Sequence, residues 1–493
     1  MQIRKILSNS QYFNENEAVL SMDFKKSKRF LLILAAIYWV LVIGIYAISY
    51  DQFRYTAVSG DVPEAQFVIG EIVDEMELCQ EISAPGDFLS SIDIRTATYD
   101  RSNSGSLILT ITDSTGTLVA EQKTEVAGFE NNAYTSISFA ERVQVTSGEP
   151  LLLTITTQGC STDNAITIYA GRGEGFQAYL ADGQAGDGEL CIRVNGYNAL
   201  SFYKTYWIIV FAAFALLSVY TAVCWKAALK GMSNPIVSLC TVYSRYSFLI
   251  KQLVSRDFKT KYKRSALGMA WSFMNPLLTM SVQYIVFSTL FKSDIPNYPV
   301  YLLTGIVFFS FFNEAVTMGM TSITGNAALI KKVYMPKYIY PVSRIFSSLV
   351  NFAFTLAPLF LMMIVTGTPF KASMFLLIFD IMCLLAFIIG MTLLLTTAMT
   401  FFQDTQFLWS VFSMMWQYLT PVFYPETIIP AQWLPIYRLN PMYQFITFAR
   451  ICITEGVSPA PSAYFYCLFS AAAVLLAGVA VFKKFQNKFV MYL

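Results

Sequence analysis

The sequence predicts an α-helical polytopic membrane protein that carries one inserted all-β domain. Hydrophobic residues make up 55% of the 493 residues and charged residues only 13%, which is about half the charged fraction of a soluble domain. Apolar runs of about 20 residues recur along the chain, and this length crosses the hydrocarbon core of a bilayer. Between residues 50 and 205 this pattern gives way to short segments of alternating polarity, which are typical of β-strands.

The first two apolar runs enclose the region of alternating polarity. Residues 30–49 follow a basic N-terminal segment at 1–29, and residues 206–225 are followed by Lys226 and Lys230. Because basic flanks of membrane spans favour the cytoplasm, we expect both flanks to be cytoplasmic. The region between the two spans, residues 50–205, is then extracellular.

This region is expected to form an antiparallel β-sandwich. Its alternating positions are Leu107, Leu109 and Ile111, and Leu151, Leu153 and Ile155, with glycine-containing turn material between the runs. It contains 22 acidic and 8 basic residues, a net of −14, whereas the rest of the chain has a net of +16. This negative charge disfavours tight capture of a polyanion. Three of its residues, Cys79, Cys160 and Cys191, could form one disulfide, and the sequence does not choose the pair.

A second region, residues 269–493, is expected to contain six further spans. They are predicted at 269–291, 299–320, 345–366, 372–402, 406–424 and 462–482. Eight spans place both termini in the cytoplasm of a plasma-membrane protein. The expected cytoplasmic segments then hold 22 Lys and Arg residues. The short outer loops hold four, Lys292, Lys371, Arg438 and Arg450, which agrees with the positive-inside rule.

An amphipathic helix at 243–265 precedes these six spans. Tyr246, Leu249, Ile250 and Leu253 follow helical spacing and form an apolar face, with basic residues opposite. We expect this helix to lie in the cytoplasmic membrane interface. One interpretation is an anchor with snorkelling lysines. The other is a binding site for an anionic lipid head group or phosphate, formed by Arg256, Lys259, Lys261, Lys263 and Arg264.

The same region resembles the type-2 ABC exporter permeases that move polysaccharides or teichoic acids. The resemblance rests on "RDFKTKYKRSALGMAWSFMNPLL" at 256–278, on "LLTGIVFFSFFNEAVTMGMTSITGNAALIKKVYMPKYIYPVS" at 302–343, on "FQDTQFLWSVFSMMWQYLTPVFYPETIIP" at 402–430 and on "LNPMYQFITFAR" at 439–450. It covers about residues 243–493 and not residues 1–240. It implies a six-span permease core that exports a polymer carried on an isoprenoid phosphate.

The resemblance also implies a coupling helix at 326–336 that docks on an ATPase subunit. Its residues are Asn326, Leu329, Ile330, Lys331, Lys332, Tyr334, Met335 and Pro336. The sequence has no GxxxxGK[ST] phosphate-binding motif. We therefore expect no catalytic site and no cofactor in this chain, with ATP and magnesium bound by two copies of a partner ATPase. One coupling segment per chain further implies that the permease works as a homodimer.

The outer connection at 425–450 is rich in proline and aromatic residues, and a re-entrant segment fits it. Tyr418, Phe423, Tyr424, Trp433 and Tyr437 are candidate channel or gate aromatics. Most aromatic residues at such a depth belong to the interfacial belt, and some could stack against sugars.

Other functions remain open at this stage. The chain could be an ABC exporter of a drug or lipid, or a membrane-anchored carbohydrate-binding sensor or adhesion protein. Deletion of residues 50–205 separates these, because a sensor would lose all function and an exporter would keep residual transport. A membrane glycosyltransferase is disfavoured because no acidic pair suits a metal–sugar-nucleotide site. The chain has no histidine, and we expect neither a metal site nor a nucleic-acid partner.

Overall fold

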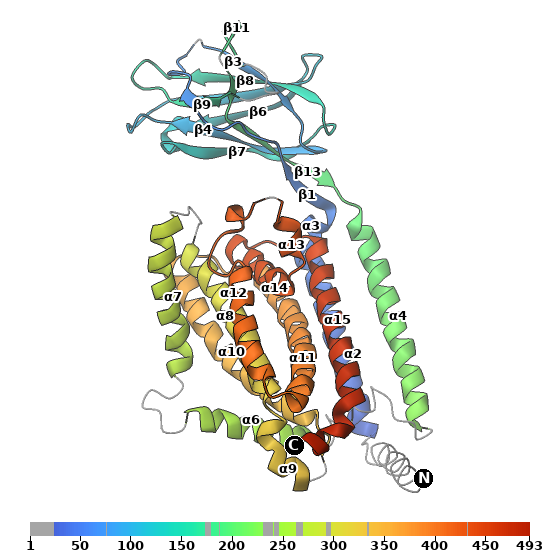
Figure 1. Ribbon diagram of the computed structural model, residues 1–493. Coiled ribbons are helices and arrows are strands. Elements are labelled where there is room, and N and C mark those ends of the chain that lie inside the picture. Colours follow the sequence, from blue (N-terminus) through green and yellow to red (C-terminus); the bar gives the residue numbers. More distant parts are fainter. Residues whose placement is uncertain are drawn as a thin grey trace. The chain divides into compact units, whose positions relative to one another are not determined.

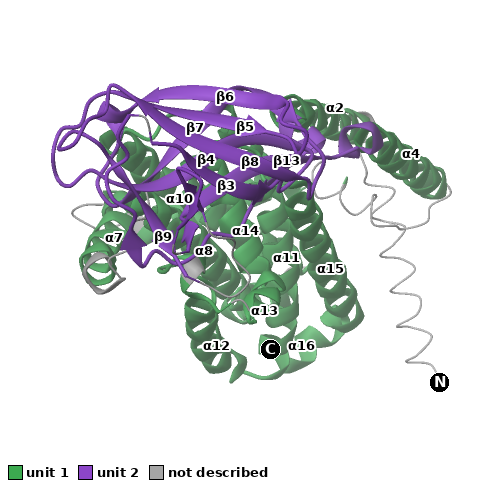
Figure 2. Cartoon of the chain, turned by 90° about the horizontal axis from the view of Figure 1, so that it is seen from above, with its two compact units in different colours: residues 1–50, 206–493 green, residues 51–205 purple. Residues whose placement is uncertain are grey.

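The computed structural model describes residues 24–74, 76–172, 179–186, 188–229, 240, 246–262, 270–291, 297–332, 335–430 and 432–493. The chain forms two compact units, which Figure 2 shows in different colours. Residues 1–50 and 206–493 form a helical unit, and residues 51–205 form a β unit. The β unit is therefore an insertion between two helices of the other unit.

The helical unit contains a helix at each position where a span is expected. These helices are α2 (Phe24–Ile48), α4 (Phe202–Leu229), α7 (Ala270–Phe291), α8 (Tyr298–Met320), α10 (Ile339–Val365), α11 (Leu377–Phe401), α12 (Thr405–Leu419) and α15 (Pro461–Phe485). Shorter helices are α3 (Tyr50–Arg54), α6 (Ser247–Tyr262), α9 (Ala327–Lys332), α13 (Leu434–Arg438), α14 (Pro441–Arg450) and α16 (Phe489–Tyr492).

Six of the described helices are long and apolar enough to cross a membrane. They are α2, α4, α8, α10, α11 with the preceding turn, and α15 with the C-terminal turns. Helix α7 contributes a shorter apolar stretch at 273–287, and α12 has only 15 residues. The number and composition of these helices are those of a multi-pass membrane protein.

Helix α8 lies at the centre of the unit. In the most apolar 18-residue segment of α8, 72% of the residues are buried. In the corresponding segments of α2 and α4, only 11% are buried. Helix α8 packs against α10, α11, α7 and α14. The apolar side chains of α2 and α4 instead stay exposed, which suits contact with lipid. Figure 1 shows α8, α10 and α11 running side by side, with α6 crossing one end of the bundle close to α9.

Helices α11 and α15 pack closely because glycines meet at their crossing. A Cβ atom placed on Gly390 would overlap the carbonyl of Val474, and one placed on Gly478 would overlap the carbonyl of Gly390. Small residues at such crossings let two helix backbones approach closely, which is a common device in membrane bundles.

The β unit is a sandwich of two antiparallel sheets. Its longer strands are β1 (Tyr55–Ser59), β3 (Leu78–Ser83), β4 (Phe88–Ala97), β5 (Ser106–Thr112), β6 (Leu118–Glu125), β7 (Ala133–Gln144), β8 (Pro150–Gln158), β9 (Thr167–Gly171) and β13 (Ile192–Ala199). Strands of two residues are β2 (Phe67–Val68), β10 (Leu180–Ala181), β11 (Gln184–Ala185) and β12 (Glu189–Leu190).

The seven-stranded sheet has the order β1-β13-β4-β9-β12, with β7 paired to β4 and β2 to β9. The six-stranded sheet has the order β11-β10-β3-β8-β5-β6. Inward residues of both sheets form one buried core, as the alternation in β5 and β8 predicts. The three cysteines of this unit, Cys79, Cys160 and Cys191, are all free thiols in the structure.

Candidate functional site

Helix α6 is anchored by one face to α10. Its residue Leu253 is buried, as the amphipathic pattern predicts. Phe258 stacks on Phe354 of α10 with ring centroids 5.7 Å apart. Asp257 forms an ion pair with Arg344 of α10, with Oδ2 2.9 Å from Nη1. Because the Asp257 side chain is only 6% exposed, this pair fixes the position of α6 in a setting that water screens poorly.

The predicted head-group residues divide into three groups. Arg256 and Lys259 are exposed, and Arg256 also contacts its neighbour Asp257, with Nη2 3.1 Å from Oδ1. Lys261 is directed toward the helical bundle, where its ammonium group pairs with Glu314. The last two, Lys263 and Arg264, lie outside the described residues.

Lys261 belongs to a three-residue polar cluster that joins α6, α8 and α10. Its Nζ lies 2.8 Å from Oε1 of Glu314 on α8. The second carboxylate oxygen of Glu314 accepts a hydrogen bond of 2.8 Å from Nδ2 of Asn351 on α10. Both oxygens of the carboxylate therefore have partners. An ionised acid within a span needs such partners to be tolerated.

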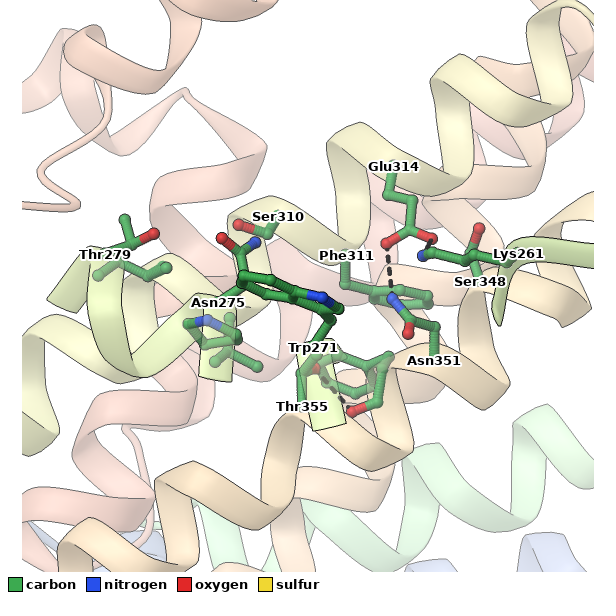
Figure 3. A pocket seen from close by; sticks show the side chains of 14 residues that line it. Lys261, Trp271, Asn275, Thr279, Ser310, Phe311, Glu314, Ser348, Asn351 and Thr355 are labelled. Atoms are coloured by element: carbon green, nitrogen blue, oxygen red, sulfur yellow. Dashed lines mark hydrogen bonds and ion pairs between the residues drawn. The ribbon is translucent and has the colours of Figure 1, made fainter. Parts of the chain in front are cut away.

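This cluster borders a cavity of about 280 Å³ between α6, α7, α8 and α10. Figure 3 shows the ring of Trp271 and the amide of Asn275 from α7, with Ser310 from α8, around the same space as the cluster. The lining thus combines an aromatic face, hydroxyl and amide groups and an ion pair. Such a surface can stack against a ring and hydrogen-bond to hydroxyl or phosphate oxygens.

Helix α9 is a short helix between the two buried helices α8 and α10. A 3-10 turn at Thr324–Asn326 leads into it. The side-chain amide of Asn326 donates to the Ser322 carbonyl at 2.7 Å. One side of the segment, Ile330 and Met335, packs on a cluster that includes Tyr340 and Phe489.

The other side of α9 is exposed. Leu329, Lys331 and Lys332 all reach the surface. Pro336 is half-buried, and its carbonyl accepts a hydrogen bond from the Ile339 amide. Tyr334 lies outside the described residues. An exposed leucine close to two exposed lysines, on a helix that packs on the bundle by one side, suits contact with a partner protein.

Arg450 holds the outer connection to the bundle. It is the last residue of α14, and its side chain is buried. Its Nη1 donates to the carbonyl of Pro421 and its Nη2 to the carbonyl of Val422, both at 2.7 Å. Its Nε donates to the carbonyl of Tyr301 on α8 at 3.2 Å. One guanidinium therefore bonds to three backbone carbonyls, two of which, those of Pro421 and Val422, lie outside regular helix geometry.

Asn440 supports the same connection from the start of α14. Its side-chain oxygen accepts from the Met442 amide, as a helix N-cap does, and from the indole of Trp416 at 2.8 Å. Its amide nitrogen donates to the Thr420 hydroxyl at 2.8 Å. The connection is therefore an ordered, hydrogen-bonded segment, which is how membrane proteins accommodate non-helical backbone.

The five candidate gate aromatics have different surroundings. Tyr418 is 61% exposed and Trp433 is 51% exposed. Phe423 is buried and stacks on Phe287 of α7 at 5.7 Å between centroids. Tyr424 is half-buried and donates to the carbonyl of Tyr418 at 2.9 Å, and Tyr437 is also half-buried. The structure thus places Phe423 in packing and leaves Tyr418 and Trp433 accessible.

Sequence reasoning missed four residues of these sites. Asn351, Arg344 and Asn440 are polar residues in or next to apolar segments, and that position was the available signal. Arg450 was counted as an ordinary base of an outer loop, whereas it is buried on carbonyl groups.

Comparison with known protein families identifies one segment of the chain, which runs from α6 through α14. Residues 248–454 match the ABC-2 type transporter family. This part of the chain is an ABC-2 type transporter permease domain. The domain thus includes the polar cluster, helix α9 and the Arg450 anchor.

Several relatives of this permease domain are known. Over 243 residues the chain is 28% identical to "O-antigen export system permease protein RfbA" of Klebsiella pneumoniae, covering 49% of this chain and 93% of the relative. The protein of the same name from Myxococcus xanthus is 28% identical over 252 residues, or 50% and 95% of the two chains. "Polysialic acid transport protein KpsM" of Escherichia coli is 21% identical over 242 residues, or 48% and 92%.

Proposed function

We propose that this chain is the permease subunit of an ATP-driven exporter that moves a lipid-linked polysaccharide or teichoic-acid-like polymer to the cell surface. The observation that carries the proposal is helix α9, because it lies within the matched permease domain, packs by Ile330 on the cluster around Tyr340 and leaves Leu329, Lys331 and Lys332 exposed. Relatives of the domain are named as O-antigen and polysialic acid transport proteins. These names support a glycan as the cargo.

The proposed assembly contains two permease chains and two ATPase chains. This chain lacks a phosphate-binding motif of the GxxxxGK[ST] type, so nucleotide and magnesium would bind to the partner. ATP-driven closure of the partner subunits would push on the segment 326–336. Because Ile330 and Met335 pack on the cluster around Tyr340, that motion would pass into α10 through side-chain contacts.

The proposed substrate route begins at α6, on the cytoplasmic side together with both chain termini. The exposed Arg256 and Lys259 would attract the phosphate of an isoprenoid-linked glycan. The cavity beside Lys261, Glu314 and Trp271 lies next to this surface and presents groups that suit a first sugar. The glycan would then leave past the accessible aromatics Tyr418 and Trp433.

The partner claim can be tested by copurification and ATP hydrolysis. The tagged chain is expressed with the ATPase encoded beside it, and hydrolysis is measured in reconstituted membranes with and without vanadate. A double variant, Lys331→Glu with Lys332→Glu, should lose the ATPase or uncouple its activity by at least tenfold. The matched control is Lys483→Glu with Lys484→Glu, because these lysines are also exposed and lie near the C-terminus.

Two outcomes would contradict the proposal. If the purified chain transported its substrate without any ATPase, the proposal that a partner ATPase drives transport would be wrong. Equal loss in both double variants would mean that general charge, and not the surface of α9, causes the effect. Loss of coupling in the first double variant alone, with the ATPase otherwise active, supports the docking role of α9.

A further inference from the structure

The β unit presents a polar outer face on its seven-stranded sheet. Along β13 the core side is formed by Ile192, Val194 and Gly196, so that Arg193, Asn195 and Tyr197 lie on the opposite side. The register of β4 and β7 places Arg95 opposite Tyr134 on this same side. We call this side the Arg–Tyr face. It consists of Tyr55, Ser59, Ser91, Asp93, Arg95, Tyr134, Ser136, Ser138, Arg142, Tyr169, Arg193, Asn195 and Tyr197.

Two arginines and two tyrosines form one end of the Arg–Tyr face. The guanidinium carbon of Arg95 lies 5.1 Å from the ring centroid of Tyr169 and 5.8 Å from that of Tyr134. The guanidinium carbon of Arg193 lies 5.1 Å from the Tyr134 ring. These cation–π contacts hold the guanidinium groups against aromatic rings. Guanidinium groups held this way are oriented before any ligand arrives, which lowers the entropy cost of binding.

A third arginine forms a similar group at the other end. The guanidinium carbon of Arg142 lies 4.2 Å from the centroid of Tyr55 and 4.7 Å from that of Tyr197. Arg142 is exposed. The face therefore repeats one chemical unit, an arginine over two tyrosines, at two separate places.

Small polar side chains fill the sheet between the two groups. Asn195 donates to the Ser91 hydroxyl at 3.2 Å and accepts from the Ser59 hydroxyl at 2.8 Å. Ser136 and Ser138 on β7 are exposed beside them. A row of hydroxyl and amide groups between aromatic and basic groups is suited to an extended, hydroxyl-rich ligand, because each group can donate or accept a hydrogen bond.

The charge on this face is opposite to that of the unit. The region 50–205 has a net charge of −14, yet three of its eight basic residues, Arg95, Arg142 and Arg193, gather here. The acid on the face is Asp93, opposite Arg193 in the strand register. None of the three arginines makes an ion pair with a carboxylate among the described residues of the β unit.

Arg95 is held in place by contacts within the sheet. Its Nη2 donates to Asn132 at 3.0 Å, and its guanidinium lies near the rings of Tyr134 and Tyr169. This side chain is therefore positioned before any ligand arrives.

We propose that the Arg–Tyr face binds an acidic glycan, one that bears carboxylate or phosphate groups along its chain. The arginines would pair with the anionic groups, and guanidinium pairs with carboxylate or phosphate are both strong and directional. The tyrosine rings would contact the sugar C–H surfaces, and the serines and Asn195 would bind hydroxyl groups. The strongly negative remainder of the unit would reject a longer polyanion such as nucleic acid from any other surface.

This proposal goes beyond polymer export and does not depend on it. Binding to the Arg–Tyr face needs neither ATP nor a partner subunit, so its failure would leave the export proposal intact. In the same way, loss of ATPase coupling would leave glycan binding unchanged. The two proposals can therefore fail separately.

The test uses the full chain in nanodiscs of phosphatidylcholine, which carries no net charge. Binding is measured by isothermal titration with alginate oligosaccharides as the carboxylate probe, phosphomannan as the phosphate probe and dextran oligosaccharides as the neutral probe. Alginate, phosphomannan or both should bind, and dextran should bind at least tenfold more weakly. Which anionic probe binds more tightly identifies the charged group. Affinity should fall as salt is raised.

Variants locate the binding surface. Arg193→Gln and Arg142→Gln should each weaken anionic-glycan binding by about tenfold, the loss of one charged contact of roughly 1.4 kcal/mol. Arg142 is exposed, so its replacement leaves the fold intact. Lys123→Gln makes the same charge change on an exposed position of the other sheet and should bind as the wild type does.

Three results would overturn the proposal. One is the absence of wild-type binding to both anionic probes. Another is dextran binding as tight as alginate binding. The third is an equal loss of binding in Lys123→Gln and in the arginine variants.

Discussion

Replacement of Arg450 by methionine should detach the outer connection from the bundle. The change keeps a long side chain but removes the donors to Pro421, Val422 and Tyr301. A hydrogen bond to a charged group contributes about 1.5–3 kcal/mol, so three give a gross loss of roughly 5–9 kcal/mol. Methionine avoids the desolvation of a buried ion, which offsets several kcal/mol of this loss. The net loss in free energy of unfolding should therefore be about 3 kcal/mol.

The assay for this prediction is unfolding of the purified chain in mixed detergent micelles, followed by tryptophan fluorescence. Trp416 is a suitable reporter because its indole bonds to Asn440 in the same connection. The matched control is Arg438→Met, since Arg438 lies in the same segment but has a side chain that is 61% exposed. Arg438→Met should lose less than about 1 kcal/mol. If Arg450→Met were as stable as Arg438→Met, the three-carbonyl anchor would not hold the connection.

Three further predictions concern other parts of the chain. Glu314→Gln should weaken the contact with Lys261 and reduce export activity at least fivefold while leaving expression unchanged; normal export would show that the cluster is only structural. Gly478→Leu should push α15 away from Gly390 and destabilise the protein by about 2 kcal/mol or more, because overpacking of a tight interface forces the backbone to move. A variant as heat-stable as the wild type would refute this prediction. Burial raises the pKa of Glu189 from 4.5 to about 7, so the folded state binds an extra proton and the β unit should lose stability as pH rises from about 4.5 to 7. Glu189→Gln should flatten this dependence in pulse proteolysis at pH 5 and 7.5, and an unchanged slope would contradict it.

The sequence predicts single elements of the fold well because each element has its own periodic signal. The alternating run around Leu109 folds as β5, and the helical spacing that ends at Leu253 gives α6 its buried face. Runs of apolar residues likewise coincide with helices in the permease domain. These signals are local, since the side chains on one face of an element recur at a fixed interval.

Pairings between elements have no such signal. Lys261 and Glu314 are 53 positions apart, and helical periodicity shows which face of each helix is buried but not which residue of another helix it meets. Arg450 looked like a loop base because its carbonyl partners lie at least 28 positions away. The Arg–Tyr face was also hidden, because the net charge of a region does not show on which side of a sheet its arginines gather.

The two ends of the β unit are neighbouring strands. Tyr55 of β1 pairs with Ala199 of β13, and the Leu200 amide donates to the Arg54 carbonyl. The chain that enters the β unit through α3 and β1 therefore leaves it through β13, directly beside its point of entry. A sandwich joined in this manner can be removed, replaced or acquired as a cassette, since a short hairpin turn would close the same gap. Genes with this arrangement can exchange the inserted module without redesign of the helical unit.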